Sequence, residues 1–293
     1  MNSTQNNLPS KKTLADKFSK FKIRFLIITW IIVLISAIYF SASFFYTLYS
    51  ISNIQGSYFK IDVIDNHPIY TRVNTPPRHW VSLPKISQRL QHAIVTSEDG
   101  IFYLHPGYDL EQLRNAINES FVLKKKMRGA STITQQLVKN LYLSRDKKFG
   151  RKISELIFAI ALEKNCDKQK ILEIYLNIIE YGKGLYGIEK ASQYYFNKMP
   201  SQLNSRESAF LAMLLPSPVK YSKSFKNKSL TPFARRMINS ILLKMRQSGY
   251  ISEEEYNEQL ISRFSWEKII SSENDGPSEE ETEIGPDEFD EII

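Results

Sequence analysis

The chain has 293 residues, enough for one sizeable domain with additional segments or for two small domains. Its formal net charge of +8 is unevenly distributed, because residues 273–293 hold ten acidic side chains and no basic one. The rest of the chain, with 39 basic and 21 acidic side chains, carries +18. Such a body suits an anionic partner: nucleic acid, an acidic membrane surface or a phosphorylated substrate. The single cysteine, Cys166, excludes an intramolecular disulfide and leaves the compartment open.

An apolar segment near the N-terminus predicts a membrane anchor. Residues 25–47 contain no charged side chain, and 22 such residues in a helix span roughly 33 Å. Residues 1–24 hold six basic side chains against one acidic side chain, so the positive-inside rule places this basic tail in the cytoplasm and the rest of the chain outside. A cleavable signal peptide, with Ser41, Ala42 and Ser43 at its cleavage site, and a buried core helix are the alternatives. The length of the apolar run and the adjacent basic cluster favour the anchor.

Beyond the anchor, the pattern predicts one mainly α-helical domain. Residues 48–79 mix short β-like stretches with prolines and are expected to form an irregular stalk or linker. Apolar residues then recur three and four apart, as in 151–164, 171–181 and 207–215. We expect the main domain at 80–250 and a helical extension at 251–272. Residues 273–293 have the composition of a disordered acidic tail.

The first informative motif, SEDGIFYLHPGYD, begins at Ser97. Glu98 and Asp99 are adjacent, and Phe102 and His105 follow them. A carboxylate beside apolar side chains can have a raised pKa, as a general acid or base requires. Taken alone, however, the pair fits a solvated helix end beside a hydrogen-bonded histidine better than it fits a catalytic site.

The second motif, RGASTITQQLVKNLYL at 128–143, predicts a helix start. Thr132 and Gln135 have the spacing of a capping box. Free backbone N–H groups at a helix start form a natural anion site. An ordinary capped helix explains Thr132 and Gln135 but not the successive glutamines, nor the Lys and Asn that follow them. The candidate binding residues here are Ser131, Thr132, Gln135, Gln136, Lys139 and Asn140.

The third motif, KKFGRKISE at 147–155, is strongly basic. Arg151 and Glu155 share a helix face at i and i+4, which fits a surface ion pair. The density of basic residues equally fits a site that holds a pyrophosphate through charge-assisted hydrogen bonds. The residues alone do not decide between the two.

Taken together and in this order, the three motifs resemble the glycosyltransferase family that includes the monofunctional peptidoglycan transglycosylases and the N-terminal domains of class A penicillin-binding proteins. The resemblance covers about Trp80 to Met245, and residues 170–177, 186–196, 214–222 and 241–245 look like the remaining family blocks. The residues that carry it are Glu98, Asp99, Phe102, His105 and Gly107 in the first motif, Gly129, Ser131, Thr132, Thr134, Gln135 and Gln136 in the second, and Arg151, Lys152 and Glu155 in the third.

The resemblance implies a two-lobed, lysozyme-like fold that polymerises lipid II into glycan strands. Glu98 would deprotonate the acceptor's 4-hydroxyl group, the anomeric configuration would invert, and undecaprenyl pyrophosphate would leave. Glu155 would be the second catalytic carboxylate, which orients the basic residues, holds a divalent cation or assists the leaving group. The implied substrate-binding residues are Asp99, Phe102, His105, Ser131, Thr132, Gln135, Gln136, Lys139, Asn140, Lys147, Arg151 and Lys152.

One position departs from the family pattern. The family usually has arginine where this chain has Lys147, which keeps the charge but loses the two-pronged hydrogen bonding of a guanidinium group. Arg145 is an alternative contact. Lys147 is therefore a weaker candidate for pyrophosphate binding than Lys152.

Cofactors and partners follow from the same reasoning. No cofactor is expected to be required and no cluster has metal-ligand spacing, although Mg²⁺ or Mn²⁺ fits pyrophosphate chemistry. The expected partners are lipid II, the growing glycan strand and the bacterial inner membrane, with a periplasmic catalytic domain. Cell-wall synthesis or division proteins are further candidate partners, and an outward topology disfavours nucleic acid. Residues 108–128 are expected at the membrane surface or, alternatively, as an ordinary surface helix.

Two other classes of function stay open. A lysozyme-like hydrolase would use the same glutamate as an acid on finished glycan, and a non-catalytic scaffold would recruit cell-wall synthesis proteins. A transpeptidase is not expected, because the chain has SxxK matches but neither a KTG nor a KSG sequence, so no penicillin binding is predicted.

Overall fold

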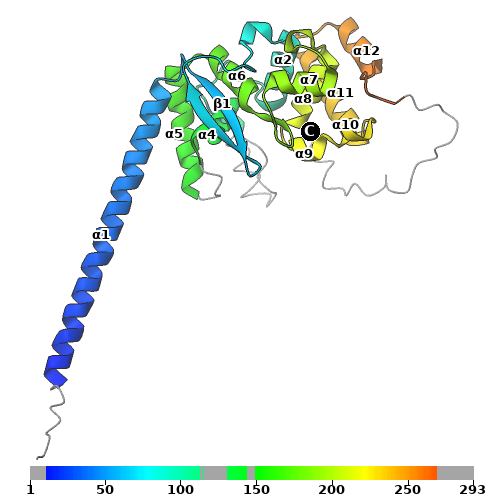
Figure 1. Cartoon of the computed structure of the whole chain (residues 1–293). Coiled ribbons are helices and arrows are strands. Elements are labelled where there is room, and N and C mark those ends of the chain that lie inside the picture. Colours follow the sequence, from blue (N-terminus) through cyan, green and yellow to red (C-terminus); the bar gives the residue numbers. More distant parts are fainter. Residues whose placement is uncertain (1–10, 113, 115–130, 144–148, 269–293) are drawn as a thin grey trace, which may run out of the picture. The chain divides into compact units, whose positions relative to one another are not determined.

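A computed structural model of the chain describes residues 11–112, 114, 131–143 and 149–268 (Figure 1). The chain divides into two compact units, residues 1–50 and 51–293. The predicted acidic tail, most of residues 108–128 and Lys147 lie outside the described residues.

The N-terminal helix α1 (Lys11–Ser52) contains the predicted anchor. Its stretch Arg24–Ser52 is the one described helix that is long and apolar enough to cross a membrane. None of its most apolar window is buried by protein, and side chains such as Trp30 and Phe40 are about 70% exposed, at 71% and 70%. A core helix would be covered by protein, whereas these side chains are exposed. Apolar surface on this scale fits a helix that lies in lipid.

Residues 48–79 differ from the expected irregular stalk. Residues 48–52 complete α1, and β1 (Tyr58–Ile64) pairs antiparallel with β2 (His67–Val73). Asp65 and Asn66 both have positive φ angles, 52° and 61°, as the two-residue turn of a tight hairpin requires. Asp and Asn tolerate this conformation better than most residues, which is why a hairpin closes here without glycine.

The remaining elements are almost all helical, which confirms the mainly α class. A short strand pair, β3 (Glu180–Gly182) and β4 (Leu185–Tyr186), interrupts them. The helical elements are η1 (Leu83–Lys85), α2 (Gln88–Glu98), α4 (Ile133–Tyr142), α5 (Phe149–Asn165), α6 (Lys168–Ile178), α7 (Ile188–Phe196), η2 (Pro200–Gln202), α8 (Ser205–Leu214), α9 (Pro218–Tyr221), α10 (Lys223–Asn227), α11 (Pro232–Gln247) and α12 (Glu253–Ile261).

The helices of the second unit pack in two groups. In one, α8 lies against α2 and α11, which Figure 1 shows grouped together, and every residue of α8 is buried. In the other, α4 packs between α5 and α6, and β1 lies on α6. These two groups fit the two predicted lobes. The likeness to lysozyme stays a prediction.

The hairpin is fastened to α6 by an aromatic and charged cluster. The Lys170 ammonium lies 4.3 Å from the ring centre of Tyr58 and 5.3 Å from that of Trp80. The indole N–H of Trp80 donates to Glu173 at 3.0 Å, and Lys170 pairs with the same carboxylate at 2.8 Å. The hairpin therefore forms a fixed part of the domain.

The C-terminal extension packs on α8 through aromatic rings. After α12, Phe264 stacks on Trp266 with ring centres 4.8 Å apart, and it lies 5.3 Å from Phe210 and 5.7 Å from Phe196. Phe264 is 4% exposed. The predicted extension is thus part of the folded domain as far as residue 268.

We expect Phe264→Ala to lower the free energy of unfolding by about 3–5 kcal/mol, because it leaves a cavity in this aromatic cluster. Ile261→Ala, three residues earlier on an 85% exposed side chain, is the matched control and should change it by less than about 0.5 kcal/mol. Denaturant unfolding of both variants measures the difference. Equal effects would show that the extension does not pack on the domain.

Candidate active site

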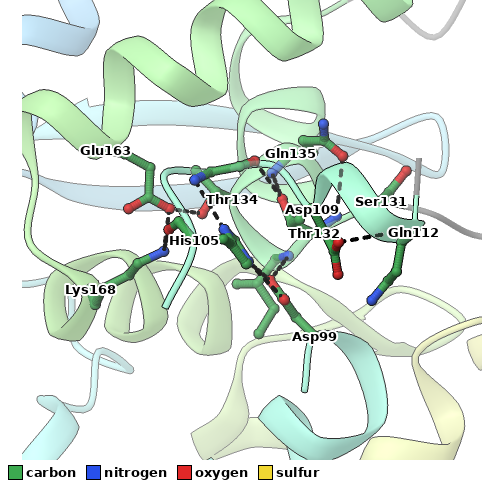
Figure 2. Close-up of polar contacts among 12 residues, drawn as sticks. Asp99, His105, Asp109, Gln112, Ser131, Thr132, Thr134, Gln135, Glu163 and Lys168 are labelled. Atoms are coloured by element: carbon green, nitrogen blue, oxygen red, sulfur yellow. Dashed lines mark hydrogen bonds and ion pairs between the residues drawn. The ribbon is translucent and has the colours of Figure 1, made fainter. Parts of the chain in front are cut away.

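The Asp99 carboxylate joins the first two sequence motifs (Figure 2). Its side chain is 0% exposed and accepts hydrogen bonds from Nε2 of His105 at 2.8 and 2.9 Å. It also accepts the backbone N–H of Ile133, the first residue of α4, at 3.0 Å. A negative charge at a helix N-terminus is favourable, so Asp99 fixes the start of α4 beside the end of α2.

The histidine has a defined proton position. The backbone N–H of Gly107 donates to Nδ1 of His105 at 3.0 Å, so neutral His105 carries its proton on Nε2, where it donates to Asp99. Gly107 has a φ of +93°, and a Cβ atom there would lie 2.8 Å from Cγ of Glu163. Glycine is therefore required at this turn.

A second, partly buried ion pair supports the same loop. Lys168 pairs with Glu163 at 2.7 Å and donates to the carbonyl of His105 at 2.8 Å, while its ammonium lies 4.4 Å from the ring centre of Phe102. Glu163 also accepts from the hydroxyl of Thr134, as Figure 2 shows. The sequence reasoning missed Glu163 and Lys168, because only the fold brings α5 and α6 to the first motif.

The predicted capping box is confirmed. The hydroxyl of Thr132 accepts from the N–H of Gln135, and the side chain of Gln135 accepts from the N–H of Thr132, each at 3.2 Å. The Thr132 hydroxyl also donates to the carbonyl of Gly107 at 2.8 Å. Both side chains thus hold α4 and the loop together.

Five of the predicted substrate-binding residues are buried by other parts of the protein. Their role in substrate binding stays a prediction. These residues are Asp99, Phe102, His105, Thr132 and Gln135.

Glu98 has its own hydrogen-bonded support. It ends α2 and is half-buried. Nε2 of Gln136 donates to Oε2 of Glu98 at 2.7 Å, and the hydroxyl of Tyr175 donates to Oε1 of Gln136 at 2.9 Å. Burial raises the pKa of the Glu98 carboxyl group, and neighbouring Asp99 adds to this effect. The hydrogen bond from Gln136 and the charge of Lys139 lower the pKa without cancelling the rise.

Gln136 and Tyr175 also line a cavity of about 180 Å³. One wall combines the predicted residues Gln136, Lys139 and Asn140 of α4 with Tyr175 of α6. The hairpin and later segments complete the lining, with Pro68, Tyr70, Ile179, Glu180, Tyr186, Leu215 and Pro218.

The third motif forms a basic cluster near α4. Lys152 donates to Glu155 at 2.6 Å and to the hydroxyl of Ser131 at 3.1 Å. The carboxylate of Glu155 is almost buried, whereas the Lys152 side chain is half-exposed, so the hydrogen bond to Glu155 fixes the position of the ammonium group. The expected i,i+4 partner, Arg151, has a buried Nε with no hydrogen-bond partner among the described residues. Ser131, Arg151, Lys152 and Glu155 are thus brought together.

Lys139 interacts with the charges of the basic cluster and with the charge of Glu98. Loss of hydration around its ammonium lowers the pKa of Lys139, although the residue as a whole is exposed. Glu155 and Glu98 raise this pKa, and the positive charges of Arg151 and Lys152 lower it. Three cations against one nearby carboxylate of the cluster leave a net positive charge that suits an anionic ligand.

Tyr175 is a site residue that the sequence reasoning missed. It stands in the run ILEIYLN, where it looks like one more apolar position of α6. The usable signal was the hydroxyl group, since a buried tyrosine usually has a hydrogen-bond partner.

Among the residues that the structure describes, no group of three or more His, Cys, Asp or Glu side chains could hold a metal ion. The expectation that no cofactor is required stays a prediction.

The three motifs lie within a region that is similar to known proteins. Residues 65–246 match the family model described as Transglycosylase. The chain belongs to the transglycosylase family. It is 43% identical over 176 residues to the biosynthetic peptidoglycan transglycosylase of Shewanella frigidimarina (strain NCIMB 400), an alignment that covers 59% of this chain and 76% of that one. This confirms the family resemblance and the enzyme class.

Two longer proteins contain a similar region. Penicillin-binding protein 1A of Aquifex aeolicus (strain VF5) is 38% identical over 190 residues, which cover 65% of this chain and 26% of that protein. A crystal structure of penicillin-binding protein 1A from Haemophilus influenzae aligns with 72% of this chain and 21% of its own, at 24% identity and a TM-score of 0.35.

The raised pKa of Glu98 has a consequence for stability. A carboxyl group whose pKa is higher in the folded than in the unfolded chain destabilises the fold when it is ionised, and this effect disappears as the pH falls below the ordinary value of 4.5. We therefore expect Glu98→Gln to melt at a higher temperature than the unaltered transglycosylase at pH 8. The gain should shrink as the pH falls toward 4.5. Thermal unfolding across this range measures it, and a gain that does not vary with pH would contradict a raised pKa.

Asp99→Asn should act in the opposite direction. The amide has an NH2 donor in place of one of the two carboxylate oxygens that accept from Nε2 of His105, so the variant should lose about 1–3 kcal/mol of unfolding free energy. Denaturant unfolding at pH 7 measures this loss. Unchanged stability would show that the Asp99 hydrogen bonds do not hold the site together.

Proposed function

We propose that this enzyme polymerises lipid II into glycan strands, with Glu98 as the general base. Curated relatives named biosynthetic peptidoglycan transglycosylases support the substrate class. The observation that carries the mechanism is the setting of Glu98, a carboxylate with a raised pKa that is hydrogen-bonded to Gln136, a residue of the cavity wall, and that feels the charge of Lys139. The acceptor's 4-hydroxyl group would lose its proton to Glu98 and attack the donor's anomeric carbon, with inversion of configuration.

The raised pKa suits this role. A base works best when its pKa approaches the working pH, because it must be ionised and must still bind a proton strongly. The Gln136 hydrogen bond and the Lys139 charge lower the pKa of Glu98 and so favour its ionised form.

The basic cluster suits the leaving group. When the bond from the donor's anomeric carbon to the phosphate oxygen breaks, its electron pair stays on that oxygen, and Lys139, Arg151 and Lys152 would stabilise the new negative charge of the undecaprenyl pyrophosphate. Glu155 would orient Lys152 through their hydrogen bond. We propose no required cofactor, although Mg²⁺ or Mn²⁺ would suit a pyrophosphate, and polymerisation with and without EDTA tests whether a divalent cation is needed.

The location follows from α1. Its apolar stretch Arg24–Ser52 would span the inner membrane, with the basic residues before it in the cytoplasm and the catalytic domain in the periplasm. The domain would then meet a substrate whose lipid chain is held in the same membrane. Cell-wall synthesis or division proteins stay candidate partners.

The decisive experiment uses the full chain in detergent with labelled lipid II. The unaltered enzyme should form polymer, and Glu98→Gln should be slower by about 10²–10⁴-fold, the usual contribution of a general base. Glu254→Gln, on the exposed start of α12, is the control and should keep full activity.

The same assay gives a pH profile. Because the base must be ionised and its pKa is raised, activity should fall as the pH drops through a value above 4.5. Full activity of Glu98→Gln would reject the mechanism. Release of soluble muropeptides from purified sacculi, without polymer formation from lipid II, would instead identify a hydrolase.

A further inference from the structure

Tyr175 lies behind the base rather than in contact with it. It stands on α6, is 1% exposed, and is linked to Glu98 by hydrogen bonds through Gln136 of α4. Its hydroxyl donates to Oε1 of Gln136 at 2.9 Å, and Nε2 of the same amide donates to Glu98 at 2.7 Å. Three side chains from three helices therefore form one hydrogen-bonded chain that ends at Glu98.

The direction of this chain depends on the tyrosine proton. A glutamine amide has one accepting end and one donating end, and turning it over exchanges them. Turned over, Gln136 would point Oε1 at the Glu98 carboxylate, where two acceptors repel each other. Burial raises the pKa of Tyr175 well above its ordinary value, so the phenol keeps its proton and can always donate to Oε1. A weaker contact of Nε2 with the carbonyl of Ser131, at 3.5 Å, has the same direction.

We propose that Tyr175 is a positioning residue that keeps the donating end of Gln136 on Glu98 and thereby keeps this base ionised. This inference rests on the proposed function of Glu98. It goes further because it assigns a role in the reaction to Tyr175, which is hydrogen-bonded to Gln136 and not to Glu98 itself.

Other groups near Glu98 act differently. Among the described residues, the charged or titratable groups that act on Glu98 are Lys139 of α4, Asp99 at the end of α2 and Tyr175 of α6. Lys139 lowers the pKa of Glu98 and Asp99 raises it by charge alone. Neither effect requires a particular orientation of Gln136, so loss of the Tyr175 hydroxyl can be separated from both.

The test compares Tyr175→Phe with Tyr181→Phe in the lipid II assay over a range of pH. Tyr181 is also fully buried, but its hydroxyl contacts the carbonyl of Leu176, at 3.5 Å, and not Gln136. Tyr175→Phe should move the acidic limb of the pH profile upward by about half to one pH unit, the value of one hydrogen bond. On that limb the rate should fall about three- to tenfold, and at high pH it should change little. Tyr181→Phe should leave the limb in place.

A double variant distinguishes positioning from direct substrate contact. If Tyr175 acts through Gln136, then Tyr175→Phe should change the rate by less than about twofold when Gln136→Met is already present. If instead its hydroxyl binds substrate, the full effect would persist in that background and would appear mainly in KM. Either persistence of the effect or a limb that does not move in Tyr175→Phe overturns the proposal.

A stability measurement tests the coupling between Tyr175 and Glu98 independently of enzyme activity. The gain in melting temperature from Glu98→Gln at pH 8 should be larger in the Tyr175→Phe background, because an unsupported Glu98 is costlier to ionise. An equal gain in both backgrounds overturns the inference. Absence of polymerisation by the unaltered enzyme would reject the proposed function alone, so the two failures are distinguishable.

Discussion

The site depends first on one buried carboxylate. Asp99 accepts hydrogen bonds from His105 and from the start of α4, and it thereby joins two motifs that are more than thirty residues apart in the chain. The end of α2 and the start of α4 are fixed together as a result. This brings Glu98, the neighbour of Asp99, into hydrogen-bonding contact with Gln136, in the first turn of α4. The adjacent carboxylates thus have separate tasks. Asp99 is buried and accepts hydrogen bonds that hold the site together, whereas Glu98 is half-buried and bonded to Gln136, which lines a cavity.

The electrostatics of Glu98 are a balance of opposed effects. Partial burial and Asp99 favour its protonated form, whereas Gln136 and Lys139 favour its ionised form. A fully solvated carboxylate would be ionised but a weak base, and a fully buried one without partners would stay protonated. The same environment makes the ionised group unfavourable for folding, which is the usual relation between a reactive site and the stability of the fold that holds it.

Elements remote from the motifs make this geometry rigid. Lys170 and Glu173 hold the hairpin on α6, and Pro68 and Tyr70 of the hairpin line the same cavity as Gln136. Ring packing around Phe264 fastens the C-terminal extension to α8, which in turn supports α2. The precision of the hydrogen bonds at Glu98 therefore rests on packing distributed over both groups of helices.

The sequence by itself determined what depends on local pattern: the apolar N-terminal helix, the mainly helical class, the capping box of Thr132 and Gln135, and the motifs that hold Glu98, Gln136 and Lys152. Each of these follows from residue types at fixed short spacing. The tertiary structure alone decided which polar residues face the cavity and which are sealed behind it, because Asp99 and His105 look as reactive as Glu98 in the sequence. It also decided that residues 58–73 pair as a hairpin on α6, and that Glu155 bonds to Lys152. Tyr175 is the clearest case, since its hydroxyl has meaning only beside Gln136, a residue of another helix. Burial and hydrogen bonding between distant segments are properties of the fold, and no local pattern encodes them.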